Sequence, residues 1–157
     1  MPMTSPCLWF DRQAQQAAEF YVSVFPRSRI KTVTHYGPGG HMPEGTVLTV
    51  DFELDGRSYT ALNGGTHFRF SPAVSLVIHC ASQDEVDHYW QRLSADTECE
   101  QCGWLVDRYG LSWQVVPTVL MEMLQHPDGA RRRRVTAALL AMKKLDVAGL
   151  QRAFDAS

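Results

Sequence analysis

The chain has 157 residues, of which 45% are apolar and 20% are charged, and its formal net charge at pH 7 is -2. This length suffices for one well-buried core and is short for two independent domains, so we expect a single domain over residues 1–157. A pI near 6.3 gives no overall basic field, which argues against a nucleic-acid partner. The opening residues lack a basic region followed by an apolar run, and no apolar stretch is long enough for a membrane span, so we expect a cytoplasmic protein.

The first part of the chain predicts a strand, a helix and then three more strands. The helix is indicated by an apolar stripe at helical spacing, formed by Ala14, Ala17, Ala18 and Tyr21. The strands are indicated by alternating polarity and are expected at about residues 7–10, 30–36, 48–54 and 59–63. Asp55-Gly56 is typical of a hairpin turn between the last two strands.

The same order of elements begins again after residue 72. A strand is expected at Val74 to Cys80, and the helix after it has the apolar stripe Val86, Tyr89, Trp90 and Leu93. Phe20-Tyr21 and Tyr89-Trp90 correspond at a shift of 69 residues, which indicates an internal repeat. A late hairpin at Gly103 to Pro117 turns at residues 107–110. We therefore predict two βαβββ modules, at about residues 1–66 and 72–117.

The remaining residues, 118–157, predict a helical appendage. We expect helices at about residues 118–125, from Asp128 onward and from Asp146 to Phe154, with both aspartates as N-caps. The apolar stripe Val135, Ala138, Leu139 and Met142 is more than a free surface helix needs. The appendage should therefore pack against the modules or against a partner subunit.

Strand alternation assigns each strand residue to one of two sheet faces. The face beneath the helices is expected to carry Leu8, Phe10, Leu76, Ile78, Leu111 and Trp113. The opposite, open face is expected to carry Cys7, Trp9, Tyr59, Asn63, Ser75, Val77, His79, Ser112 and Gln114. This mixture of aromatic and neutral hydrogen-bonding groups suits a small amphipathic molecule. An equally good interpretation is that these residues fill a closed sheet core or a dimer contact.

Three segments carry a family resemblance: CLWFDRQAQQAAEFYVSVFP at residues 7–26, ALNGG at 61–65 and GLSWQVVP at 110–117. They are similar to the PhnB-like branch of the vicinal-oxygen-chelate superfamily, which includes glyoxalases, extradiol dioxygenases and bleomycin-resistance proteins. The resemblance covers nearly the whole chain. It implies an α+β fold in which paired βαβββ modules form a curved mixed sheet, here with C-terminal helices added. It also implies a homodimer, with modules paired within or between chains.

The resemblance bears on metal binding too. Positions that hold metal ligands in the superfamily correspond here to Ser5 or Cys7, Asn63, Ser75 and Gln114. Neutral oxygens of this kind are weak ligands for a divalent ion. We therefore expect no catalytic metal and no cofactor. A rebuilt site would have to use His67 or His79.

Three functions are compatible with this sequence. We favour a metal-independent protein that binds a small molecule. The alternative is an enzyme of the superfamily, such as a metal-dependent lyase, isomerase or dioxygenase. Proteins of this branch are also often labelled 3-demethylubiquinone-9 3-methyltransferase. A methyltransferase would need a glycine-rich turn between a strand and a helix, whereas the glycines at positions 37, 39, 40, 64 and 65 lie in hairpin or inter-module loops.

Several other motifs have plain alternatives. Cys99 and Cys102 form a CxxC motif without the second ligand pair that zinc requires, and their role is left open. The run Arg131 to Arg134 points around most of a helix, so a solvated face is favoured over nucleic-acid contact. The loop at residues 37–45 is either a plain hairpin loop or a lid over a pocket. His79 is favoured as a structural group over a general base.

Overall fold

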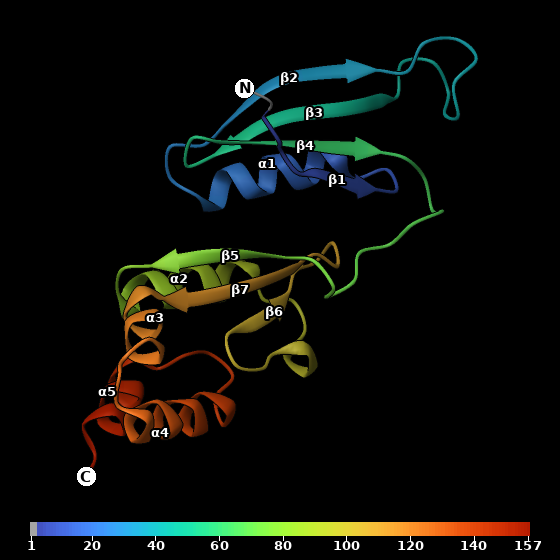
Figure 1. Ribbon diagram of the computed structural model, residues 1–157. Coiled ribbons are helices and arrows are strands. Elements are labelled where there is room, and N and C mark those ends of the chain that lie inside the picture. The colour runs from blue at the N-terminus through green and yellow to red at the C-terminus, as the bar shows by residue number, and fades with distance from the viewer. Residues whose placement is uncertain (1–2) are drawn as a thin grey trace. The chain divides into compact units, whose positions relative to one another are not determined.

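The computed structural model describes residues 3–157, and the chain divides into two compact units between Phe70 and Ser71. The first contains β1 (Cys7–Phe10), α1 (Ala14–Val24), β2 (Arg29–His35), β3 (Val47–Leu54) and β4 (Arg57–Asn63) (Figure 1). The second contains β5 (Ser75–Cys80), α2 (Gln83–Leu93), the short 3-10 helix η1 (Thr97–Cys99), β6 (Trp104–Val106), β7 (Ser112–Pro117), α3 (Thr118–Leu124), α4 (Gly129–Leu140) and α5 (Val147–Asp155). The predicted α+β class is confirmed. None of the helices within residues 3–157 has the length and apolar character to cross a membrane.

The first unit is a complete βαβββ module. Its strands lie in the order β1-β4-β3-β2, with β1 parallel to β4 and the other pairs antiparallel. Helix α1 covers one face of this sheet (Figure 1), because its predicted apolar stripe is buried. Tyr21 of that stripe stacks against Phe52 of β3, with the ring centroids 6.3 Å apart. The core of the first unit therefore lies between α1 and the sheet.

The second unit differs from a complete βαβββ module by one strand. Its sheet has the order β5-β7-β6, with β5 parallel and β6 antiparallel to β7. At the position where the first unit has β2, the second has η1. The turn begins there because the side chain of Asp96 accepts a hydrogen bond from the backbone N–H of Glu98. The predicted repeat is thus correct in its strand-helix-strand order. The second copy lacks the strand that corresponds to β2.

The three C-terminal helices form a hydrophobic cluster together with the end of β7. Its buried members are Val116, Leu120, Met123, Val135, Leu145 and Leu150. The chain between α4 and α5 joins this cluster to the β6 hairpin, because the carbonyls of Met142 and Lys143 accept hydrogen bonds of 2.8 Å from the N–H groups of Cys102 and Gly103. The appendage therefore packs on the second unit, one of the two placements that the sequence left open.

The two predicted N-caps of the appendage behave differently. The Asp128 side chain accepts hydrogen bonds from the N–H groups of Ala130 and Arg131, as an N-cap should. Asp146 occupies the N-cap position of α5 but makes no capping hydrogen bond. Its carboxylate lies 3.6 Å from the guanidinium of Arg152 instead. The prediction of a side-chain cap was therefore correct for α4 and wrong for α5.

The four consecutive arginines of α4 serve mainly to hold neighbouring helices. Arg134 donates hydrogen bonds of 2.9 and 3.1 Å to the carbonyls of residues 153 and 154, at the end of α5. Arg131 lies over the aromatic ring of α5, 4.7 Å from its centroid. Arg132 donates to two carbonyls in the connection between α3 and α4. Within the described chain, Arg133 makes no such contact. Three of these four arginine side chains therefore make hydrogen bonds or ring contacts within the protein.

We expect Arg134→Gln to lower the free energy of unfolding by about 1–2 kcal/mol, because carbonyls at the end of α5 lose a charged donor. Arg133→Gln is the matched control and should change it by less than about 0.5 kcal/mol. Urea denaturation of both variants measures the difference. Equal effects of the two substitutions would show that the carbonyl contacts do not stabilise the appendage.

Candidate functional site

The open face of the second sheet carries four of the predicted site residues. Ser75 pairs with Ser112 across β5 and β7, and Gln114 and His79 lie further along the same face. The opposite face packs under α2 with buried Trp113 and other apolar residues. The Gln114 side-chain amide donates a hydrogen bond of 3.0 Å to the Ser75 hydroxyl. The predicted face is therefore confirmed for these four residues, and their contact with a ligand stays a prediction.

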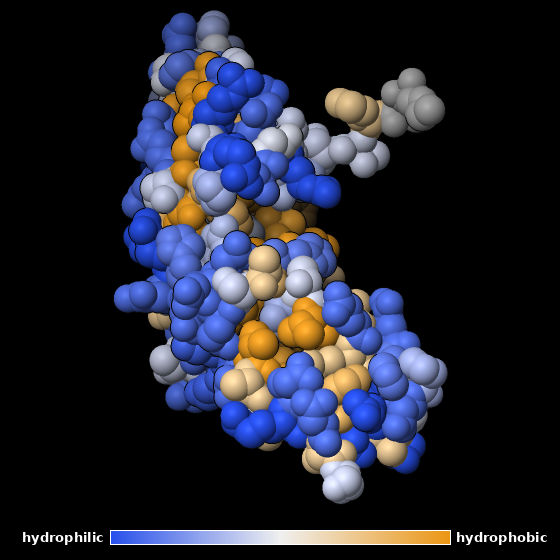
Figure 2. Space-filling view, turned by 90° about the vertical axis from the view of Figure 1, so that its left-hand side faces the viewer, coloured by the Kyte–Doolittle hydropathy of each residue, from blue (hydrophilic) through white to orange (hydrophobic). Residues whose placement is uncertain are grey.

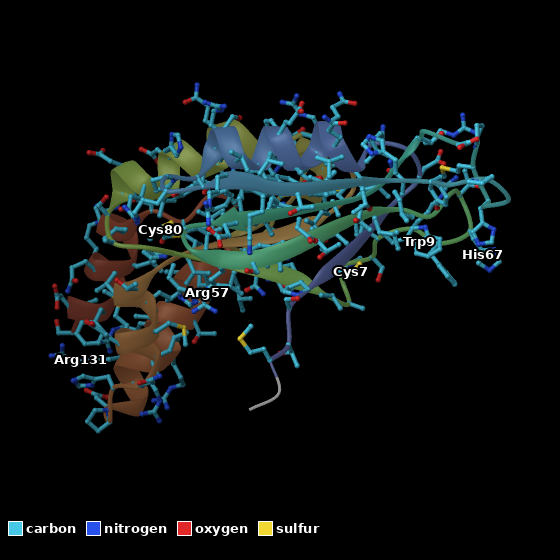
Figure 3. The ribbon with its side chains drawn as sticks, turned by 90° about the horizontal axis from the view of Figure 1, so that it is seen from above. Cys7, Trp9, Arg57, His67, Cys80 and Arg131 are labelled. Carbon is cyan, nitrogen blue, oxygen red and sulfur yellow. The ribbon has the colours of Figure 1, made fainter. Side chains whose placement is uncertain are left out.

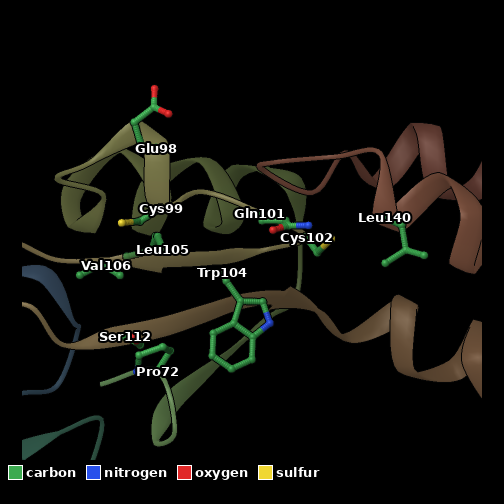
Figure 4. A pocket seen from close by; sticks show the side chains of 10 residues that line it. All are labelled: Pro72, Glu98, Cys99, Gln101, Cys102, Trp104, Leu105, Val106, Ser112 and Leu140. Carbon is green, nitrogen blue, oxygen red and sulfur yellow. The ribbon is translucent and has the colours of Figure 1, made fainter. Parts of the chain in front are cut away.

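A cavity of about 670 Å³ opens beside β6, where η1 replaces a fourth strand (Figure 4). Its walls are mostly apolar and include Trp104, Leu105 and Val106 of the strand. Leu140 at the end of α4 lines it as well, although 62% of this residue is exposed to solvent. This volume lies in the range that small-molecule sites commonly have.

Ser112 is the distinctive polar residue of this cavity. It is only 1% exposed, and its hydroxyl has no hydrogen-bond partner within residues 3–157. A buried hydroxyl without a partner costs about 1–3 kcal/mol. Such groups are uncommon in native proteins, and a bound molecule is one way to satisfy them. Ser112 is thus the polar group that best marks a ligand site.

Asp107 holds the hairpin that carries Ser112. Its buried carboxylate accepts hydrogen bonds from the backbone N–H groups of Tyr109 and Leu111, at 2.8 and 3.1 Å. Its second oxygen accepts a hydrogen bond of 2.9 Å from the indole N–H of Trp113. The sequence predicted the turn at residues 107–110 but gave no role to this carboxylate. The available signal was an aspartate in the first position of a turn that ends in glycine.

The open-face assignment was wrong for two residues of the first unit, Tyr59 and Asn63. The Asn63 side-chain oxygen accepts a hydrogen bond of 2.8 Å from the backbone N–H of Ala14, the first residue of α1. Its side-chain nitrogen donates to the carbonyl of Val47 at 3.0 Å. Tyr59 stacks on Phe52, with the ring centroids 5.4 Å apart. Both residues therefore face the helix.

The physical reason for this error is that β4 lacks a clear polar alternation. Its helix-facing set is Arg57, Tyr59, Ala61 and Asn63, and its open-face set is Ser58, Thr60 and Leu62, so both faces mix polar and apolar residues. Moreover, α1 begins after Gln13, whose side chain makes no capping hydrogen bond. The amide of Asn63 supplies that bond from a neighbouring strand, and no local sequence pattern shows it.

We expect Asn63→Ala to destabilise the protein by about 2–4 kcal/mol, because it removes the side-chain partner of the buried Ala14 N–H and of the partly buried Val47 carbonyl. Ser58→Ala, at an exposed position of the same strand, is the control and should have little effect. Thermal or urea unfolding measures both. Unchanged stability of the Asn63 variant would contradict this structural role. Asn63 would then again be a candidate for contact with a ligand.

Cys7 and Trp9 behave as strand alternation predicts and face away from α1. Desolvation raises the pKa of the Cys7 thiol, and the Asp51 carboxylate raises it further. The thiol is therefore protonated at neutral pH and is a poor nucleophile or metal ligand.

Trp9 packs on the chain that follows β4. Its indole N–H donates a hydrogen bond of 2.9 Å to the carbonyl of Gly65. A Cβ atom at Gly64 would lie 2.3 Å from the ring, so a side chain has no room there. Trp9 and His67 lie at the same end of the first unit (Figure 3). The ALNGG segment therefore forms a close support for the indole.

A second cavity, of about 500 Å³, lies at this end of the first unit. Trp9 and the two glycines form part of it, and His41 and Met42 of the loop between β2 and β3 form another part. Met42 is buried. The loop begins at Tyr36, whose hydroxyl donates a hydrogen bond of 2.6 Å to the carbonyl of Asn63. The loop therefore lines a pocket, and its action as a lid stays a prediction.

The CxxC motif does not form a shared site. Cys99 and Cys102 both line the cavity of the second unit, but Figure 4 shows their side chains pointing away from each other. The Cys99 thiol donates a hydrogen bond to the Asp96 carboxylate, and this bond is the main factor that raises the pKa of Cys99. Among residues 3–157, no group of three or more His, Cys, Asp or Glu side chains is placed to hold a metal ion.

The comparisons with known proteins agree with this architecture. A family model described as 3-demethylubiquinone-9 3-methyltransferase matches residues 2–116, which is well over half of the chain. The chain belongs to this family. The resemblance to the PhnB-like branch is thereby confirmed. The chain has no match among curated proteins.

Several solved structures are similar to about three quarters of this chain along nearly their whole length. The PhnB protein from Bacillus cereus is 29% identical over 74% of this chain and 100% of its own, with a TM-score of 0.63. The protein PA1353 from Pseudomonas aeruginosa is 15% identical over 74% of this chain and 98% of its own, with a TM-score of 0.58, and it shows the fold alone. A glyoxylase/bleomycin resistance protein/dioxygenase domain from Frankia sp. EAN1pec is 13% identical over 74% of this chain and 91% of its own, with a TM-score of 0.47. The family match ends at residue 116, so α3, α4 and α5 lie beyond it.

We expect Gly64→Ala to destabilise the first unit by about 1–3 kcal/mol, because the added methyl group would displace the Trp9 ring. Gly37→Ala is the matched control, since a Cβ atom there meets nothing within 4 Å. Urea denaturation gives the stabilities, and the fluorescence of Trp9, identified with a Trp9→Phe variant, reports the ring. Identical behaviour of both glycine variants would contradict the close packing of the indole.

Proposed function

We propose that this protein binds a small amphipathic molecule, without a metal ion, in the cavity of the second unit. The observation that carries the proposal is the buried hydroxyl of Ser112, which lines a cavity of about 670 Å³ and has no partner within the described residues. A ligand that accepts or donates one hydrogen bond there would recover the cost of burying that group.

The chemistry of the walls narrows the class of ligand. Trp104, Leu105 and Val106 offer aromatic and aliphatic surface. Glu98 is the carboxylate among the lining residues, and Figure 4 shows its side chain directed away from the others. An uncharged, largely apolar molecule with a carbonyl or hydroxyl group therefore fits best.

Metal independence rests on the chemistry of the predicted ligand positions. Asn63 is engaged in capping α1. Gln114 and Ser75 bond to each other, and both offer only neutral oxygens. Neutral oxygens bind divalent ions weakly, so these residues support a binding protein better than a metalloenzyme.

The proposal includes a cytoplasmic homodimer. The open face of the second sheet has Val77 at 43% exposure, and Val74 just before it is 70% exposed. Apolar side chains on an open sheet face favour coverage by another surface. Light scattering at micromolar concentration should give the mass of two chains. The mass of one chain would contradict the dimer. It would not bear on the ligand site, which has its own test.

The binding proposal can be tested with 6-propionyl-2-dimethylaminonaphthalene, an uncharged fluorophore with a carbonyl group that accepts hydrogen bonds. We expect the intact protein to bind this probe with a blue-shifted emission, because the walls are apolar. Ser112→Ala should weaken binding by about fivefold to tenfold, since one hydrogen bond of about 1 kcal/mol or slightly more is lost. Ser58→Ala, in the first unit, should leave binding unchanged.

The stability of the same variant separates a ligand residue from a structural one. Free Ser112→Ala protein should be as stable as the parent, or more stable by about 1 kcal/mol, because an unpartnered hydroxyl has been removed. A loss of stability would show that the hydroxyl has a structural role. Binding of the probe that is unaffected by Ser112→Ala would contradict the proposed site.

A further inference from the structure

The cavity of the first unit lies where the ends of two parallel strands meet the start of a helix. Strands β1 and β4 run parallel, with Trp9 opposite Leu62, and α1 starts four residues after β1 ends. The cavity measures about 500 Å³ and is lined entirely by residues of the first unit. This cavity is therefore separate from the second unit and from the ligand site proposed above.

Opposite charges stand side by side in this cavity. Asp11 and Arg12, adjacent in the loop between β1 and α1, both line it. Among the described residues, neither of these exposed side chains forms an ion pair or a hydrogen bond, although they are neighbours. A purely anionic molecule would meet the carboxylate, and a purely cationic one would meet the guanidinium. A molecule with both charges can satisfy both groups at once.

The remaining walls supply an apolar surface and further hydrogen-bonding groups. The Trp9 ring is held by its hydrogen bond to the Gly65 carbonyl and packs closely on Gly64, which leaves no room for a side chain there. Met42 contributes a buried, flexible apolar wall. His41 and His67 add imidazoles that can donate or accept hydrogen bonds.

We propose that this cavity binds a zwitterionic small molecule of the α-amino-acid type with an aromatic or apolar side chain. Arg12 pairs with the carboxylate and Asp11 with the ammonium group. The apolar side chain of the ligand lies against Trp9 and Met42. The zwitterion is favoured over a simple anion because the two charged side chains occupy one cavity and are not paired with each other.

Three probes that share one aromatic ring test the charge requirement: L-phenylalanine, 3-phenylpropionate and phenethylamine. The shift of the Trp9 indole N–H resonance, assigned with a Trp9→Phe variant, reports occupation of this cavity. We expect L-phenylalanine at millimolar concentration to shift it. We expect the two singly charged probes to bind at least about tenfold more weakly, because each leaves one charged side chain without a partner.

Substitutions complete the test. Arg12→Gln and Asp11→Asn should each weaken phenylalanine binding by about tenfold. Arg69→Gln is the matched control, because this arginine is exposed in the same unit and does not line the cavity. The proposal is overturned if L-phenylalanine leaves the Trp9 resonance unmoved, if either singly charged probe binds as tightly, or if Arg69→Gln has the effect of Arg12→Gln. Ser112→Ala should leave phenylalanine binding unchanged, so failure of either site is distinguishable from failure of the other.

Discussion

The arrangement of the second unit depends on one constraint: the backbone groups on the outer edge of β6 need partners although no fourth strand is present. The chain meets this need by folding back on itself. The N–H of Ala95 donates to the carbonyl of Val106, and Gln101 and Trp104 exchange two backbone hydrogen bonds. These bonds satisfy part of the edge without extending the sheet by a further strand, and a cavity lies beside β6. Ser112, whose hydroxyl has no partner among the described residues, lines this cavity from β7.

In the first unit, the side-chain amide of Asn63 joins three elements. Asn63 ends β4 and bonds to the start of α1 and to the beginning of β3. The strand ends and the helix start are therefore fixed relative to each other. The two glycines that follow carry the chain beneath the indole of Trp9. A polar residue that the sequence suggested as a ligand contact thus connects β3, β4 and α1.

The sequence predicted much of this fold because local patterns determine much of it. The stripes of α1 and α2, the hairpin at residues 107–110 and the Asp128 cap depend on residues close together in the chain. The helix-facing orientation of Asn63 depends on a contact 49 residues away, and the side chains of β4 give no alternation from which to infer it. The missing strand depends on Asp96 starting a turn, which competes with strand formation in a short polar segment. The cavities join residues from several loops, and strand periodicity does not describe loops.

The backbone before β6 gives the C-terminal helices a further significance. Cys102 and Gly103 both have positive φ angles, of 52° and 85°, and for a cysteine this conformation is strained. Their N–H groups are held by the carbonyls of Met142 and Lys143, which lie beyond the family match. The strained corner thus sits inside the shared domain, while the groups that restrain it belong to the added segment. The boundary of sequence similarity at residue 116 is therefore not a boundary of folding, and the addition has become an integral part of the domain it follows.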